Sequence, residues 1–280
     1  MNTIRRLALA AVVALPASFA PTLATAGDVL PGEKTELTTE VRAEAEAQLK
    51  IIRDGTGEPV VKARTALLRM GPVVWPVIEN AIHLTVTDPP KPHLKYLKAL
   101  LGPKTEPEFE WLRGRLRRAI LIGKPEAFLT EFTQFRAGIP DPVKPSVRVP
   151  PKCPTTPVAG GGLSYRSADR SIVIAFGADA IAPKDPKVNF HPDGGDITVE
   201  DPTAGFLVVI GGKPIPAPRT SGRGGNAVAH APQGFAYAWA QNGAKGMKPG
   251  GQGGDASTAD AKGGAGDWSH PGDGGAGADG

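Results

Sequence analysis

The spacing of apolar residues divides the chain into regions of different period. Between residues 27 and 138, apolar side chains recur at three- and four-residue intervals, as they do on the buried face of an amphipathic helix. Six such stretches follow one another, separated by glycine or proline. In the first, which stops before Gly55, the apolar face comprises Leu37, Val41, Ala45, Leu49 and Ile52. We therefore expect an antiparallel helical domain over residues 27–138.

The second and third of these stretches resemble one HEAT-type repeat. Residues 59–84 contain Ala-Arg and Leu-Leu in the first helix, a Gly-Pro turn, and Val-x-Pro-x-Ile at the start of the second helix. The resemblance implies a curved helical scaffold that binds a partner and is not a catalyst. A generic helical bundle is the alternative, because solenoids need several such units and the following helices lack this spacing.

Residues 139–157 contain seven prolines. Proline at this density favours extended polyproline II structure and excludes helix. We therefore predict a proline-rich linker at this position, with modules that fold independently on either side of it.

Residues 158–245 change to the two-residue alternation typical of β-strands. Gly-Gly pairs at 161–162, 194–195, 224–225 and 253–254 recur roughly every 30 residues. This period predicts a stacked β array, either a solenoid or a series of hairpins, whose open edge promotes self-association. Residues 246–280 carry few bulky side chains and are expected to be a disordered, glycine-rich tail. The predicted fold class is α+β in separate modules.

The first 26 residues have the features of a secretory signal peptide. Residues 5–6 are both arginine, an apolar stretch covers 7–15, and residues 24–26 read Ala-Thr-Ala, which fits a cleavage site. The apolar stretch is shorter than the roughly 20 residues that a membrane span needs. We therefore expect export to the periplasm, the cell surface or the extracellular space, with no transmembrane segment in the mature chain.

Net charge, cysteine count and the absence of catalytic motifs argue against several classes of function. The net charge is +4, and two of these charges belong to the arginines at residues 5–6, so the remainder is too small to indicate a nucleic-acid partner. Cys153 is the only cysteine, which excludes an internal disulfide. The G-x-S-x-G, H-E-x-x-H and P-loop motifs are all absent. We predict a non-enzymatic structural or interaction protein without cofactor or metal, whose partner is a protein or an envelope glycan.

Two groups of residues are candidates for a ligand or partner surface. Arg113 and Arg117 belong to a basic cluster that is expected on a solvated helical face, with binding of an anionic glycan or phosphate as the alternative. Phe235, Tyr237 and Trp239 alternate with alanines, so a strand would place all three on one face. We interpret that face as the core side of a repeat, and a stacking platform for sugar rings is the alternative.

A carbohydrate-binding or carbohydrate-active protein built on the β repeats is the alternative function. A glycosidase would need carboxylates that converge on a cleft. Asp193, Asp196, Glu200 and Asp201 form the only close group in the repeats. Neighbouring prolines and glycines favour turns for this group, and residues 191–195, which read HPDGG, are interpreted as a hairpin turn.

The signal peptide leads to a direct test. Mature protein recovered after export should begin at or next to Gly27, because a signal peptidase cleaves after the Ala-Thr-Ala sequence. Intact-mass measurement of the exported protein checks this, and a mass that still includes Met1 would contradict it.

Overall fold

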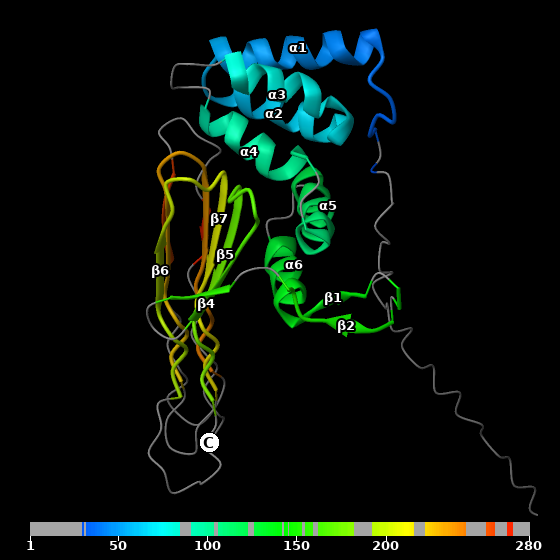
Figure 1. Cartoon of the computed structure of the whole chain (residues 1–280). Coiled ribbons are helices and arrows are strands. Elements are labelled where there is room, and N and C mark those ends of the chain that lie inside the picture. The colour runs from blue at the N-terminus through cyan, green and yellow to red at the C-terminus, as the bar shows by residue number, and fades with distance from the viewer. Residues whose placement is uncertain are drawn as a thin grey trace, which may run out of the picture.

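The computed structural model describes residues 30, 32–84, 91–103, 106–122, 126–141, 143–144, 146–152, 155–158, 162–181, 192–215, 222–244, 256–260 and 268–270. The predicted signal peptide lies outside the described residues. Within them, six α-helices and a short 3-10 turn form the N-terminal half of the chain (Figure 1). They are α1 (Thr39–Asp54), α2 (Glu58–Met70), η1 (Pro72–Val74), α3 (Trp75–Leu84), α4 (Lys91–Leu101), α5 (Pro107–Leu121) and α6 (Glu126–Ala137).

Local sequence signals set the helix ends, and the six predicted helices are confirmed. The Thr38 hydroxyl oxygen accepts a hydrogen bond from the Val41 N–H at 3.3 Å, which caps the start of α1. Pro59 lies in the first turn of α2, where a missing N–H costs nothing. Gly71 ends α2 with φ of +87°, a conformation that favours glycine.

The described strands form a short ribbon and two larger sheets. The strands are β1 (Ile139–Pro140), β2 (Arg148–Val149), β3 (Thr155–Val158), β4 (Gly162–Arg166), β5 (Ile172–Phe176), β6 (Ile197–Glu200), β7 (Phe206–Ile210), β8 (Ala227–Ala231), β9 (Phe235–Trp239), β10 (Ala256–Asp260) and β11 (Trp268–His270). The six-stranded sheet has the order β11-β9-β7-β5-β4-β3, and the three-stranded sheet has the order β10-β8-β6. The chain is thus mixed α+β, with helices first and sheets after them.

From β5 onward the chain visits the two sheets alternately. β5, β7, β9 and β11 pair in parallel in one sheet, and β6, β8 and β10 pair in parallel in the other. Consecutive strands such as β6 and β7 therefore lie in different sheets, which hairpins would not do. Phe206 pairs with Phe235 and Ile210 with Trp239, so strands about one Gly-Gly period apart place corresponding residues side by side.

Each central strand of the six-stranded sheet is buried on both faces, and alternate side chains belong to two different hydrophobic clusters. The larger side chains of β9, Phe235 and Tyr237, join the cluster that includes the helices, whereas Ala236 and Ala238 pack toward the three-stranded sheet. β5 and β7 follow the same division. The interpretation of the aromatic face as a core face is therefore confirmed.

The helices and the six-stranded sheet share one hydrophobic core. Phe132 of α6 lies 6.0 Å from the Tyr237 ring, and Tyr96 of α4 lies 5.8 Å from the Phe206 ring, measured between ring centroids. Figure 1 shows α5 and α6 alongside this sheet, with β6 on the side away from them. This arrangement differs from the expected pair of independently folding modules, because each part covers the apolar surface of the other.

The proline-rich segment also differs from the expected spacer. Ile139 pairs with Val149 in the β1–β2 ribbon, and β3 joins the edge of the six-stranded sheet. Pro140 and Pro157 lie in these marginal strands, where the N–H that proline lacks is not needed by a neighbour. The proline density therefore predicted the extended backbone but not its pairing.

The paired glycines lie where extended segments that follow or precede the strands touch one another. Gly212 donates its N–H to the Gly195 carbonyl at 2.9 Å, and Gly225 donates to the Gly212 carbonyl at 3.1 Å. A Cβ on Gly212 would lie 1.9 Å from the Ala178 carbonyl oxygen, and one on Gly194 would lie 1.8 Å from the Gly212 oxygen. None of these glycines is among the described residues with positive φ, so they are required for close approach.

Residues 192–195 consequently do not close the predicted hairpin. Gly194 donates to the Arg223 carbonyl at 2.8 Å, and Ile215 donates to the Pro192 carbonyl at 3.0 Å. The Asp-Gly pair predicted a turn from local preference, but this backbone bonds to neighbouring segments and does not close a hairpin.

Part of the predicted disordered tail forms strands. β10 pairs with β8 and β11 pairs with β9, both in parallel and in register. Disorder over residues 246–280 was expected because few of these side chains could be buried. At 256–260 and 268–270 the preceding strands supply backbone partners, which that expectation left out.

The glycine contacts predict the result of a paired substitution. Gly212→Ala should lower the free energy of unfolding by about 1–3 kcal/mol or more, because its Cβ would overlap the Ala178 carbonyl oxygen, 1.9 Å away. Gly114→Ala, in α5, meets nothing within 4 Å and should raise stability by about 0.5–1 kcal/mol. Thermal melting of both variants measures this, and equal shifts in Tm would contradict the close-approach role.

Candidate functional site

Arg113 and Arg117 lie one turn apart on α5, and both are buried. The two residues are 3% and 7% exposed. The prediction that they lie on a solvated helical face is therefore wrong. Helix α5 contacts α2, α4 and α6, and its flank also meets the turn between β4 and β5. Helical periodicity predicted that only the apolar face of α5 is buried. Contacts with distant segments also bury part of its polar face.

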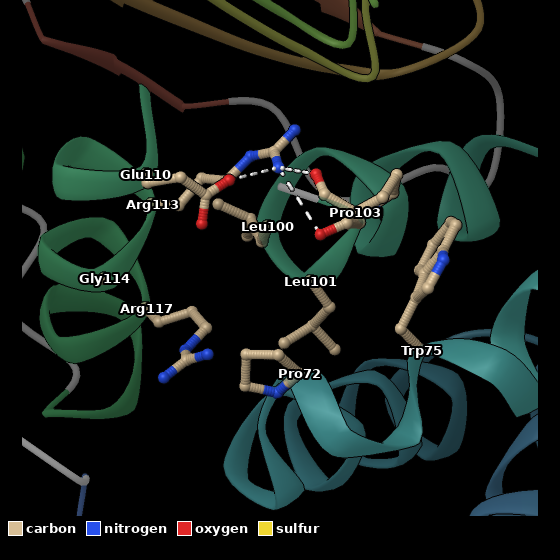
Figure 2. A pocket seen from close by; sticks show the side chains of 10 residues that line it. Pro72, Trp75, Leu100, Leu101, Pro103, Glu110, Arg113, Gly114 and Arg117 are labelled. Atoms are coloured by element: carbon tan, nitrogen blue, oxygen red, sulfur yellow. Dashed lines mark hydrogen bonds and ion pairs between the residues drawn. The ribbon is translucent and has the colours of Figure 1, made fainter. Parts of the chain in front are cut away.

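Arg113 joins three parts of the chain. Its Nη1 donates to the Pro103 carbonyl oxygen at 2.8 Å and to Glu110 Oε1 at 3.0 Å (Figure 2). Its Nη2 donates to Ser171 Oγ at 3.3 Å and lies 3.5 Å from Asp169 Oδ2, both in the β4–β5 turn. The guanidinium thus ties α5 to the end of α4 and to the six-stranded sheet.

Arg117 fastens the N-terminal segment to the same helix. Its Nη2 donates to Glu33 Oε1 at 2.9 Å, and Glu33 Oε2 accepts the Leu30 N–H at 2.8 Å. A Cβ on Gly71 would lie 2.5 Å from Glu33 Oε1, so the glycine that ends α2 leaves the space that Glu33 occupies. This is a second long-range bond that local spacing could not indicate.

A pocket of about 340 Å³ lies between these arginines and the opposing helices. Figure 2 shows the Arg117 guanidinium extending from α5 toward Pro72 on the other wall. The lining residues come from η1, α3, the end of α4 and α5, and they are Pro72, Trp75, Leu100, Leu101, Gly102, Pro103, Glu110, Arg113, Gly114 and Arg117. We call this space the α5 pocket. Its walls are mainly apolar, and its polar groups lie on α5.

The arginines of the α5 pocket retain hydrogen-bonding capacity. A guanidinium carries five N–H donors. In Arg117, only Nη2 donates to another described residue. The Nε atoms of Arg113 and Arg117 are buried without a hydrogen-bond partner among the described residues. A buried donor without an acceptor costs roughly 1–3 kcal/mol, and both Nε atoms are too enclosed for a partner to reach. The donor left for a partner is Nη1 of Arg117, which makes no hydrogen bond among the described residues.

The α5 pocket carries no excess of positive charge. Three carboxylates, those of Glu33, Glu110 and Asp169, lie within 3.5 Å of the two guanidinium groups. Burial raises the pKa of Asp169, but hydrogen bonds from Ser167 and Ser171 and the charge of Arg113 outweigh it, so the pKa lies below its ordinary value. The site therefore offers N–H donors more than it offers net charge.

The second group of candidates belongs to the core and not to an open surface. Tyr237 is fully buried, and its ring lies 5.5 Å from that of Phe128 on α6. Phe235 stacks on Phe206 with ring centroids 5.0 Å apart. Trp239, which is 8% exposed, stacks on Tyr237 at 6.2 Å. The three aromatics are therefore not a platform on which sugar rings could stack.

The described carboxylates of the repeats bond to backbone N–H groups and to arginines, and no three of them gather at one place. Asp193 accepts the Arg223 N–H at 2.7 Å, and Asp196 accepts the Asn226 N–H at 2.8 Å. Asp201 accepts the N–H groups of Thr203 and Ala204 at 2.8 and 3.0 Å. These bonds give the acids a structural role between and within coils.

No group of three or more potential metal ligands occurs among the residues that the structure describes. In the same part of the chain, no helix has the length and apolar character needed to cross a membrane. Comparison of the chain with protein-family models, with curated proteins and with solved structures finds no significant match.

Sequence reasoning found the two arginines but missed the rest of the α5 pocket. Pro72 and Trp75 line one wall, but the sequence indicated for them only a place in a helical repeat. No role was predicted for Gly114, which also lines the pocket. The single available signal was Gly114, since glycine in a helix interior costs about 1 kcal/mol relative to alanine and leaves open space.

The Asp169 environment predicts a dependence of stability on pH. A carboxyl whose folded-state pKa is lowered stabilises the fold above its unfolded pKa of about 3.9, and this contribution is lost as the pH falls through the folded-state pKa. Asp169→Asn should therefore lower Tm at pH 7, and its difference from the parent protein should shrink by pH 3. Thermal melting across this range measures both.

Asp54→Asn provides the control for that experiment. Asp54 pairs with Arg53 at an exposed site, where ion pairs contribute little. Its Tm should stay close to that of the parent protein throughout. A difference for Asp169→Asn that is the same at pH 7 and pH 3 would contradict the role given to the Asp169 charge.

Proposed function

We propose that this chain is an exported, non-enzymatic interaction protein of the cell envelope or extracellular space, whose helical part binds a protein partner. The observation that carries the proposal is the α5 pocket, where apolar walls face the Arg117 guanidinium, whose Nη1 makes no hydrogen bond among the described residues. Export rests on the signal-peptide pattern of residues 1–26.

The chemistry of the α5 pocket favours a peptide segment. Trp75, Leu101 and Pro103 offer an apolar surface to a partner's aliphatic or aromatic side chain. The Arg117 guanidinium would donate to a backbone carbonyl oxygen next to that side chain. A phosphate or an acidic glycan fits less well, because three carboxylates already lie close to the two arginines.

The finer description of the fold belongs to the same proposal. The helix–turn–helix of α2, η1 and α3 supports a HEAT-like unit, which would form one wall of the α5 pocket. The alternating parallel strands support a β-solenoid that holds the helices in place and could self-associate through its last coil. The separate bonding of the repeat acids to backbone supports binding over carbohydrate hydrolysis.

Gly114 offers a test that does not alter the arginines. A displayed peptide library is selected for binding to the full chain. Some of the selected peptides should bind the Gly114→Ala variant as tightly as they bind the parent protein. The same peptides should bind Gly114→Phe at least about tenfold more weakly, which is about 1.4 kcal/mol, because the larger side chain enters the open space beside Gly114. Isothermal titration calorimetry of each peptide measures this.

Both substitutions replace a helical glycine with a better helix former, so Tm should not fall. Peptides that bind the parent protein and Gly114→Phe equally well would place the partner surface elsewhere and overturn the proposal.

A further inference from the structure

A second hollow lies at the carboxyl ends of the parallel strands, beside α6. It consists of two contiguous spaces of about 280 and 300 Å³ that share Lys213 and Gln241. We call it the α6 groove. It shares no lining residue with the α5 pocket, so it is independent of the partner proposed there.

Strand register brings the walls of the α6 groove together. Phe176, Ile210 and Trp239 are the last residues of β5, β7 and β9, they pair across the sheet, and all three line the groove. The carboxyl ends of parallel strands are a common location for ligands in proteins with open α/β sheets. The extended segments that follow the strands add Asp179, Lys213 and other polar residues to the rim.

One side of the α6 groove is held rigid by its own contacts. Arg136 Nη1 lies 3.1 Å from Asp179 Oδ2, and its guanidinium lies 5.0 Å from the centre of the Phe176 ring. The other Asp179 oxygen accepts the Lys213 N–H at 2.9 Å. Asp179 and Arg136 therefore satisfy each other's charge and fix the backbone from which Lys213 extends.

Lys213 supplies the net charge of the groove. Among the described residues no carboxylate pairs with its ammonium group, and the residue is exposed. Leu129 and Pro214 form an apolar wall next to it. The amide side chains of Gln241 and Asn242 line the same space.

We infer that the α6 groove binds an acidic oligosaccharide, with a sugar carboxylate on Lys213. The Gln241 amide both donates and accepts hydrogen bonds and so suits a hydroxyl of the same sugar, while the apolar wall suits the C–H surface of its ring. Among the described residues that line the groove, Lys213 is the one cation without a carboxylate partner, which favours one carboxylate over a polyphosphate that would need several cations. The ligand would lie at the ends of β5, β7 and β9, and would not stack on the aromatic face of β9.

Isothermal titration calorimetry of the full chain with trigalacturonic acid tests the inference. The parent protein should bind it, more weakly at high salt, and should bind its methyl ester about tenfold less tightly, because the ester lacks the charge that a charge-assisted hydrogen bond needs. Lys213→Gln should show a similar loss of about tenfold.

Lys62→Gln is the matched control, since Lys62 is an exposed lysine on α2 that pairs with Glu58 at 2.8 Å. It should bind as the parent protein does, and all variants should melt at the same temperature. Absence of binding, or equal binding by the parent protein and Lys213→Gln, would overturn the inference. Equal binding of triglutamate would also overturn it, by showing an acidic-peptide site.

Discussion

The repeat region depends on backbone segments that touch with no side chain between them. At Gly194, Gly212 and Gly224 a Cβ would lie between 1.7 and 1.9 Å from a carbonyl oxygen of a neighbouring segment. This approach allows backbone hydrogen bonds to pass from Ala178 through Gly195, Gly212 and Gly225 to residue 241. The strands that continue from these segments are consequently stacked in register, and their side chains form continuous rows.

Glycine contacts bury little apolar surface, so the rows of side chains must supply it. Toward the three-stranded sheet the row is mostly alanine and valine, which lets the two sheets approach closely. Toward the helices it contains Phe206, Phe235 and Tyr237, whose burial requires α4 and α6. The helical half is therefore part of the fold of the repeats, and the repeats are part of the fold of the helices.

Local pattern predicted the elements well and their contacts poorly. Helix ends at Gly55 and Gly71 and the aromatic core face of β9 followed from residue type and period. The pairing of β3, β10 and β11 did not, because a strand partner depends on segments far away in sequence. For the candidate site, the basic cluster was visible, but the burial of Arg113 depends on Ser171 and Asp169, more than 50 residues later.

Charge pairing explains why the two surfaces suit different chemistry. Arg113 uses both terminal nitrogens on neighbouring carboxylate, hydroxyl and carbonyl oxygens, so what remains to a ligand is Nη1 of Arg117, which makes no hydrogen bond among the described residues. Peptide carbonyl groups match such donors without requiring charge. In the α6 groove the Asp179 carboxylate is already paired with Arg136, and Lys213 lies beside an apolar wall with no carboxylate partner among the described residues. A basic cluster therefore acquires its binding preference from the carboxylates that the fold brings to it, and counting arginines and lysines along a helix cannot reveal that preference.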